Sequence, residues 1–579
     1  MRMNTRTGGA LGAPVVVVAS VAVMFSGWTS PGTGPRDSAG ALDSLTFTEH
    51  IAPILFAECA SCHRPGGSAP FDLLTYQDVE PRLALILDAV ESRRMPPWVP
   101  EPGFVDLVGE RILGEDEIRT IRQWADQGAH EGDPADLPPA PSWYAGWELG
   151  EPDLVVELES YDVPAEGIER YRNLVAAVPL AETRYVSTVE LRFGKTRAVH
   201  HARMMIDATP SSRTHDEVDP EPGFDGMEIV TDARNPPGHF IGWAPGRVQT
   251  AGRDDIAWML EPGTDFVLQL HLQPTGIPQR VEPQVGLHFA EAAPPEASVL
   301  VMLGSYDINI PPGQSDYLVT DSYELPVDVE VLGAYPHAHY LGREIWGRAV
   351  LPDGTPRWLL RIDRWNFNSQ DMYYYEEPIF LPAGSTLSMR WVYDNSVDNP
   401  LNPHDPPRRV VYGSLSTDEM SDLVFQVVPR SLEDVETLNT DLGRKYEIDE
   451  VRYLARRQRL LGDALSEQGR FEAAIPRYQE ALRHVSDDPQ VLVGLATAFA
   501  SLEDYSTAIT IAEQAARVTG SADASVLAGV AAVYGMGGER ELAFSTFELA
   551  IDLARASGDV ALADAIRERL RAFSGGRSE

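Results

Sequence analysis

The chain of 579 residues contains only two cysteines, and both lie in the pentapeptide Cys59-Ala60-Ser61-Cys62-His63. The spacing C-x-x-C-H is typical of c-type haem attachment, in which the two thiols form thioether bonds to the porphyrin and the adjacent imidazole is an axial ligand. A thioredoxin-like redox pair is the alternative, but the strand and helix pattern that it needs is absent. With both thiols used, no cysteine remains for a structural disulfide, so the other domains must be held by core packing alone.

The residues around this motif resemble a small class I cytochrome c, which implies an all-α domain over residues 43–133. A first helix is predicted from Phe47 to Cys59, and a closing helix runs from Gly114 through Trp124 with acidic residues at its positive end. Met95 lies in a proline-bounded loop and is the candidate sixth ligand of the haem. A packed loop methionine is the alternative interpretation of Met95, and His130 is a distant second choice of ligand.

Two histidines stand two residues apart in the segment GAYPHAHYLG, after the alternating apolar run of residues 327–331. On a strand, residues i and i+2 point to the same face, so His337 and His339 would form a preformed half-site for a transition metal. Two ordinary exposed or core histidines are the alternative for such a pair taken alone.

Three further segments supply what this pair lacks: VHHA at 199–202, FVLQLH at 266–271 and STDEM at 416–420. Together the segments offer five histidines and one thioether, which suggests a three-histidine site and a site of two histidines and one methionine. A soft sulfur beside imidazole favours copper, particularly Cu(I), over magnesium or calcium. Adjacent residues on a regular strand point to opposite faces, so His200 and His201 can share a metal only if the strand ends or bulges there.

The ordered motifs HHARMM (200–205), FVLQLH (266–271), PPGQ (311–314), HAHYLG (337–342) and STDEM (416–420) resemble the copper type II, ascorbate-dependent monooxygenases that hydroxylate peptidylglycine and dopamine. The resemblance covers roughly residues 150 to 430. It implies that His200, His201 and His271 hold the electron-storing copper, and that His337, His339 and Met420 hold the copper where oxygen is activated. It also implies two jelly-roll β-sandwich domains, at 153–300 and 301–432, that face each other across a solvent cleft.

The residues support an all-β region independently, because short alternating runs recur from Asp153 onward with Pro and Gly turns between them. Residues 134–152 are rich in proline and predict a semi-rigid spacer between the haem and copper domains. The polar segment 209–237 predicts a loop over the first copper domain. Four histidines have no partner at a useful spacing and are not expected to bind metal: His215, His239, His288 and His404.

Near residue 445 the alternation gives way to helical periodicity, and proline nearly vanishes. Alanines recur at spacings of 34 and 35 residues, at Ala474, Ala508 and Ala543 and again at Ala481, Ala515 and Ala550. This is the tetratricopeptide period, in which small residues lie where paired helices approach closely. Residues 445–574 therefore predict three repeats and a capping helix from about Val560 to Phe573. Their groove would bind a peptide or the copper domains; a helical cap that only stabilises the protein is the alternative.

The N-terminal segment 1–42 has two arginines before an apolar run and then a linker rich in Ser, Gly, Thr and Pro, which is typical of a secretory signal. A retained membrane anchor stays open, because no convincing cleavage site follows. We therefore expect a periplasmic or otherwise extracytoplasmic protein. The formal net charge of −40 argues against nucleic acid and anionic lipid as partners.

The parts together predict an exported haem c and copper oxidoreductase with two copper ions, a monooxygenase that uses O₂ to hydroxylate a C–H bond of a small or peptide-like substrate. Electrons would come from an ascorbate-like or protein reductant through the cytochrome domain. Three alternatives remain: an electron-transfer protein without oxygenase activity, a copper storage or trafficking protein, and a tetratricopeptide interaction scaffold that carries a redox module.

Overall fold

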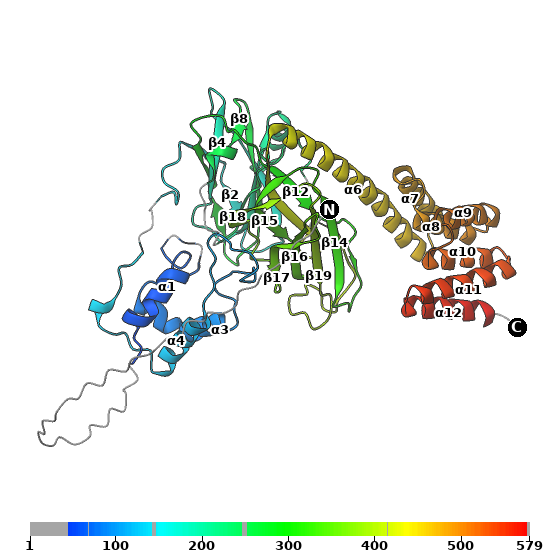
Figure 1. The fold of residues 1–579 in the computed structure, drawn as a ribbon, viewed down its shortest axis with the longest axis horizontal. Helices are drawn as coiled ribbons and strands as arrows, with labels where there is room; N and C mark the ends of the chain where they lie inside the picture. The colour runs from blue at the N-terminus through cyan, green and yellow to red at the C-terminus, as the bar shows by residue number, and fades with distance from the viewer. Residues whose placement is uncertain are drawn as a thin grey trace, which may run out of the picture.

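The computed structural model describes residues 44–575, apart from 66, 68, 142–145, 228, 246–251 and 414. The predicted secretory segment 1–42 lies outside these residues. Figure 1 shows a small helical unit (residues 44–137), a large central β region, and a set of helices reached by one long helix, α6. Within the described ranges, no helix combines the length and the apolar character needed to cross a bilayer.

The N-terminal helical unit packs its first short helix against its last long helix. Its elements are η1 (Phe47–Ile51), α1 (Ala52–Glu58), α2 (Tyr76–Val79), η2 (Glu80–Arg82), α3 (Leu83–Glu91), α4 (Glu115–Asp126) and η3 (Pro134–Asp136). The rings of Phe47 and Trp124 lie 6.3 Å apart in its core, and the Phe47 N–H donates to the carbonyl of His130. The two predicted helices are therefore present, whereas a cytochrome fold remains a prediction.

The first β unit (residues 153–290) is built from antiparallel sheets. Its elements are β1 (Leu154–Glu157), β2 (Tyr161–Val163), β3 (Arg170–Ala177), β4 (Arg184–Arg192), β5 (Val199–Asp207), α5 (Ser211–Val218), β6 (Phe224–Asp225), β7 (Ile241–Trp243), η4 (Asp254–Ile256), β8 (Trp258–Leu260), β9 (Asp265–Leu272), β10 (Gln279–Val281) and β11 (Gln284–Phe289). A five-stranded sheet, β6-β3-β9-β5-β7, and a four-stranded sheet, β1-β11-β4-β8, supply one core, to which Leu268 and Val186 belong.

The second β unit (residues 298–430) is also built from antiparallel sheets. Its strands are β12 (Val299–Leu303), β13 (Asn309–Ile310), β14 (Tyr317–Glu324), β15 (Val329–His337), β16 (Gly342–Val350), β17 (Pro356–Ile362), β18 (Tyr373–Leu381), β19 (Thr386–Tyr393), β20 (Val410–Val411) and β21 (Asp422–Pro429). The sheets β12-β21-β15-β18 and β14-β19-β16-β17 enclose a core that contains Val301 and Trp391. The predicted all-β region is confirmed, and its jelly-roll topology stays a prediction.

The segment predicted as a loop, residues 209–237, contains the helix α5 and the short strand β6, so that prediction was wrong. The helix starts where the Asp207 carboxylate accepts hydrogen bonds from the hydroxyl of Ser211 and the N–H of Ser212, both at 2.9 Å. A negative charge at this end of a helix satisfies free N–H groups, and the signal was hidden because Asp207 belongs to the preceding strand.

The helical unit docks directly on the second β unit through residues 96–111. Leu107 pairs with Tyr375 as an isolated β-bridge, and its side chain is buried in the core of that β unit. The ring of Trp98 meets Tyr373 edge-on with centroids 5.4 Å apart. The proline-rich spacer is therefore accompanied by a second, packed connection, and the relative position of the two units depends on this contact.

Seven helices follow the last strand: α6 (Leu432–Glu467), α7 (Phe471–His484), α8 (Pro489–Ser501), α9 (Tyr505–Val518), α10 (Ala524–Met536), α11 (Arg540–Ala556) and α12 (Val560–Gly575). The repeated alanines are all fully buried in α7, α9 and α11, as the 34-residue period predicts. Helix α6 begins at Leu432, before the change of composition near 445, because its first half packs on the second β unit with Leu438 and Leu442.

Two glycines make room for a buried tyrosine where the first repeat begins. A Cβ atom at Gly462 in α6 or at Gly494 in α8 would lie 2.7 Å from Cε1 of Tyr478. A Cβ at Gly443, also in α6, would meet nothing within 4 Å.

We predict that Gly443→Ala raises stability by up to about 1 kcal/mol through helix propensity. Gly462→Ala should instead be about 1–3 kcal/mol less stable than that control, because overpacking displaces the Tyr478 ring. Thermal unfolding followed by circular dichroism at the helical band measures both. Equal midpoints for the two variants would contradict this packing.

Candidate metal centre

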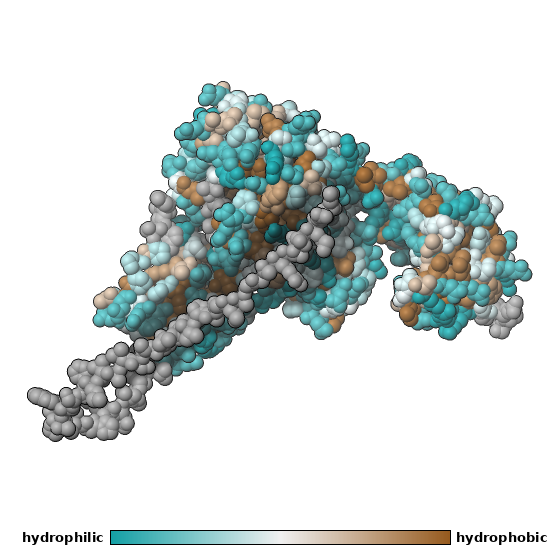
Figure 2. Space-filling view, viewed as in Figure 1, coloured by the Kyte–Doolittle hydropathy of each residue, from teal (hydrophilic) through white to brown (hydrophobic). Residues whose placement is uncertain are grey.

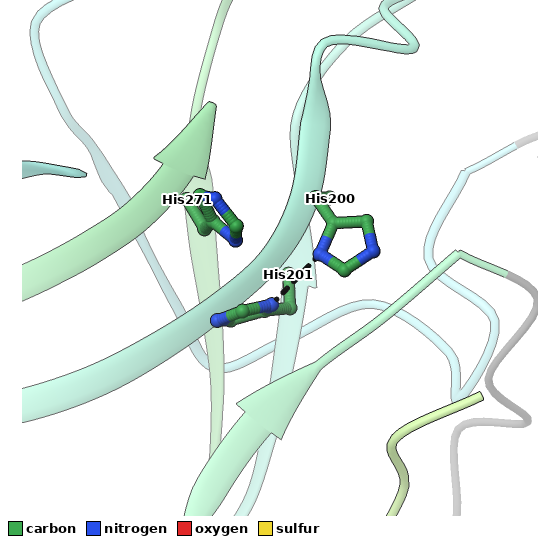
Figure 3. Close-up of side chains that lie close together, drawn as sticks. All are labelled: His200, His201 and His271. Carbon is green, nitrogen blue, oxygen red and sulfur yellow. Dashed lines mark hydrogen bonds between the residues drawn. The ribbon is translucent and has the colours of Figure 1, made fainter. Parts of the chain in front are cut away.

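Three histidines form the most compact group of possible metal ligands. One ligand atom from each of His200, His201 and His271 lies within 4.8 Å of the other two. Figure 3 shows His200 and His201 next to each other on β5, with His271 on the neighbouring strand β9. The Nδ1 atoms of His200 and His201 are 3.0 Å apart.

The backbone explains how two adjacent histidines turn towards one point. The pairing of β5 with β9 shifts register between Val199 and His201, so His200 lies at the bulge and His201 pairs with His271. The bulge predicted at 199–202 is confirmed. Strand β9 is buried along its whole length, as the run FVLQLH predicts, and His271 is fully buried.

In two of these histidines, the ring nitrogen that would not bind the metal has a hydrogen-bond partner, as expected at a metal site. Nε2 of His200 lies 2.9 Å from Oδ1 of Asn368, and Nε2 of His271 lies 3.0 Å from Oε2 of Glu169. A neutral imidazole that donates from Nε2 keeps its lone pair on Nδ1. The Nδ1 atom of His271 is buried and has no hydrogen-bond partner among the described residues. A cation bound by the three Nδ1 atoms would satisfy this nitrogen and relieve the lone-pair contact between His200 and His201.

Burial favours the neutral form of four of the candidate imidazoles. It lowers the pKa of His200 to about 4 and the pKa of His201 well below its ordinary value. Burial likewise lowers the pKa of His337 to about 4 and that of His339 to about 3. At neutral pH the four imidazoles therefore need to lose no proton before they bind a metal.

The second group of predicted ligands lies at the end of β15. His337 is the last residue of that strand, and His339 follows it, so the expectation that both lie on one regular strand was only half right. Nδ1 of His337 contacts Oε1 of Gln370, and Nδ1 of His339 lies 3.1 Å from the carbonyl of Asp418. Both Nε2 atoms are thereby left for a ligand, and the two rings are nearly perpendicular with centroids 5.3 Å apart.

The Glu419 carboxylate connects the backbone of this pair with Met420. Its Oε2 accepts from the N–H of His339 at 2.9 Å and from the N–H of Met420 at 3.2 Å, and its Oε1 accepts from Leu341. Burial raises the pKa of this carboxyl to about 8, although the backbone donors act in the opposite direction. Met420 is itself buried, and its role as a metal ligand stays a prediction.

The two groups touch each other. The ring centroids of His201 and His337 are 6.4 Å apart, and the ring of Phe367, from the second β unit, stacks on His200 at 4.7 Å. The expectation of a solvent cleft between the two sites is therefore wrong for this structure. The segment 363–372 lies where the two β units meet, and its Phe367 ring packs on His200 of the first β unit and on Tyr340 of the second.

That segment supplies residues that the sequence analysis missed. Trp365 donates from Nε1 to the carbonyl of His339, Asn368 holds His200, and Gln370 holds His337. The residues lie 26 to 168 positions from the histidines that they contact. No spacing in the sequence indicates such contacts, because they arise from the packing of the two β units.

The C-x-x-C-H motif lies at the end of α1 and fits haem attachment. Burial raises the pKa of the Cys59 thiol to about 12. Nδ1 of His63 lies 2.9 Å from the carbonyl of Phe71. This contact fixes the ring and leaves Nε2 as the nitrogen that would bind iron. The Met95 side chain is 41% exposed, and its role as sixth ligand stays a prediction.

A pocket joins all three units next to these sites. It is lined by Trp98 and Arg111 of the helical unit, by Pro245 of the first β unit, and by Asn368 and Gln370 of the second. Nη1 of Arg111 also lies 3.8 Å from Sγ of Cys62. Asn368 and Gln370, which contact His200 and His337, thus line the same pocket as Arg111. The Arg111 side chain in turn contacts Cys62 of the cysteine motif.

The histidines without predicted partners lie outside the metal cluster found among the described residues. Nδ1 of His239 contacts the carbonyl of Pro237, and Nδ1 of His215 contacts the carbonyl of Ser211. Nε2 of His404 lies 3.3 Å from the carbonyl of Thr417.

Comparison with known proteins identifies the C-terminal region. The model of the tetratricopeptide repeat family matches residues 459–525. PcrH bound to the chaperone-binding region of PopD is 22% identical, covering 21% of this chain and 92% of that chain with a TM-score of 0.19. The first TPR domain of human RPAP3 is 16% identical (21% and 95%, TM-score 0.19), and the TPR2AB domain of yeast Sti1 in complex with an HSP90 peptide is 19% identical (25% and 55%, TM-score 0.20). No curated protein matches the chain. The C-terminal helices form a tetratricopeptide solenoid.

We predict that Met420→Ala weakens retention of Cu(I) at the second group while leaving about one equivalent of copper at the three-histidine group, because a thioether chiefly favours the reduced ion. Metal analysis after dialysis against a Cu(I) chelator measures this, with Met389, a buried core methionine on β19, changed to leucine as the control. Loss of both coppers together would count against two separate sites, and unchanged Cu(I) affinity would remove Met420 from the ligands.

Proposed function

We propose that this chain is an exported haem c and copper oxidoreductase that inserts one oxygen atom from O₂ into a C–H bond. The observation that carries the proposal is the meeting of two histidine groups, one of three imidazoles and one of two imidazoles whose backbone is linked to that of Met420 through Glu419. Support for a monooxygenase in particular comes from the resemblance of the five ordered motifs. The acidic composition and the N-terminal secretory pattern support export.

The reaction balances when R–H, O₂, two electrons and two protons give R–OH and water. Copper held by the two groups would supply one-electron redox chemistry and the activation of O₂, and haem held by Cys59, Cys62 and His63 would supply the electrons. The chain's own part is to hold the imidazoles neutral and in fixed orientation. The three-histidine group would store an electron, and His337, His339 and Met420 would hold the oxygen and face the substrate.

The packing between units supports electron supply from the helical unit. Arg111 contacts Cys62 and lines the pocket that also contains Gln370, the partner of His337. Trp98 lines the same pocket and packs on Tyr373. A haem attached at the cysteine motif would therefore lie on a unit that is packed against the second β unit, and it would relay to the copper groups the two electrons per turnover that an external reductant provides.

The tetratricopeptide repeats favour a second role, an interaction scaffold that carries the redox module. Three large apolar side chains of α11, Leu542, Phe544 and Leu549, are exposed. Figure 2 shows hydrophobic residues among hydrophilic ones on the repeat helices. Such solenoids bind other proteins along extended surfaces, so a protein partner would dock here. Variants of the metal ligands test this division. If they abolish oxygen uptake but leave partner binding intact, the redox role belongs to the metal groups and the binding role to the tetratricopeptide repeats.

We predict that electrons reach the copper groups through the helical unit. When pre-reduced, copper-loaded protein is mixed rapidly with O₂ and substrate, haem absorbance should report oxidation at the rate of product formation. Cys59→Ala/Cys62→Ala protein should keep the one turnover that its two reduced coppers support, lose sustained turnover with a protein reductant, and regain part of it with excess ascorbate. If the haemless variant turns over as fast as the parent with every donor, the helical unit is not the donor.

We also predict no useful hydroxylation of glycine-extended peptides. The resemblance implies an arginine two residues before the first histidine of the H-x-H motif, where it pairs with the terminal carboxylate of the glycine-extended substrate, and this chain has Tyr335 there. The ring of Tyr335 packs on Phe240 with centroids 4.2 Å apart and lies parallel to His337 at 6.3 Å. A phenol cannot supply the positive charge. Product analysis with such a peptide tests this, and efficient turnover would contradict it.

A further inference from the structure

One carboxylate, Glu169, contacts His271 of the first histidine group and Ser416 in the loop beside the second group. It lies directly before β3 in the first β unit. Its Oε2 is 3.0 Å from Nε2 of His271 and also accepts from the hydroxyl of Ser416 at 2.6 Å, while its Oε1 accepts from the N–H of Ser416 at 3.1 Å. These partners belong to different β units and lie 102 and 247 positions along the chain from Glu169.

On the His271 side, this contact decides which nitrogen faces the cluster. Donation from Nε2 to a carboxylate fixes the tautomer with the lone pair on Nδ1, which is the buried nitrogen without a hydrogen-bond partner among the described residues. Tyr171 stacks on the same ring at 4.3 Å with an interplanar angle of 7°, so the ring plane is also held. A carboxylate behind a ligating imidazole raises its basicity and orients it.

On the Ser416 side, the carboxylate holds the loop that serves the second group. The same loop presents the carbonyl of Asp418 to His339 and places Glu419 against the N–H groups of His339 and Met420. Ser416 is buried in the second β unit. Its N–H and its hydroxyl both donate to Glu169, which belongs to the first β unit. Movement of Ser416 would therefore displace residues that hold the second group.

We propose that Glu169 is a positioning residue that couples the two metal groups, by orienting His271 for the first metal and anchoring the Ser416–Met420 loop that orders the second. The inference rests on the proposed copper sites and deepens them. It adds a carboxylate that is not itself a ligand, whose loss changes the first site directly and the second site through the loop.

Three variants distinguish the effect of Glu169 on His271 from its effect on the Ser416–Met420 loop. Glu169→Ala removes every contact. Glu169→Gln keeps one acceptor oxygen for His271 but places an amide donor against the N–H of Ser416, and Ser416→Ala removes only the hydroxyl contact. Glu166→Gln is the matched control, because Glu166 is an exposed carboxylate three positions earlier on the same segment.

The test uses the full-length chain and copper alone. Cu(II) affinity of the three-histidine group is measured by chelator competition, with the copper hyperfine splitting in electron paramagnetic resonance as a second readout. Glu169→Ala should lower the affinity by about 10–100-fold and change the splitting, Glu169→Gln should recover part of the loss, and Glu166→Gln should match the parent. A residue that only stabilises the fold would lower the melting temperature without this pattern.

Coupling is measured by hydrogen exchange of residues 415–420 in the Met420→Ala background, where copper occupies the first group. Copper should slow exchange in this loop when Glu169 is present, less so with Ser416→Ala, and have no effect with Glu169→Ala. Affinity within twofold of the parent in Glu169→Ala, or loop protection that persists without the carboxylate, overturns the proposal. If the parent itself binds no copper, the proposed function fails instead.

Discussion

The candidate sites depend on the way in which imidazoles are held by their second nitrogen. Asn368 holds His200, Glu169 holds His271, Gln370 holds His337, and the Asp418 and Phe71 carbonyls hold His339 and His63. Burial alone would only favour the neutral form of an imidazole, since desolvation disfavours the imidazolium. The added hydrogen bond fixes which nitrogen keeps the lone pair and where it points. Five of the six candidate imidazole ligands therefore have an acceptor beside the nitrogen that is not expected to bind metal.

Those acceptors are in place only because separate units pack together. The segment 363–372 brings Asn368 and Gln370 between the two β units, and Glu169 reaches across to Ser416. Leu107 is inserted into the second β unit, which fixes the helical unit beside the same region. Without disulfides these contacts are maintained by core packing and hydrogen bonds, so changes far from the histidines should reach the sites through the unit interfaces.

Much of the architecture could be predicted from the sequence, because it follows from local patterns. Alternation predicts the β region, the 34-residue period predicts the solenoid, and the His200-His201 pair predicts the bulge that the β5–β9 register contains. The helix α5 was missed because the carboxylate that accepts from the N–H of Ser212 belongs to Asp207, in the preceding strand. The closed contact between His201 and His337 was missed because it depends on how two units pack, which no local pattern encodes.

The central claim is that two copper groups and one haem share this chain. The direct measurement is metal analysis with optical and X-ray absorption spectra on protein exported from a host able to attach haem c. The account predicts one haem and two coppers per chain, with sulfur scattering from one copper in the reduced protein, lost in Met420→Ala. A haem-loaded protein that binds no copper, or that binds a single copper without sulfur, would contradict it.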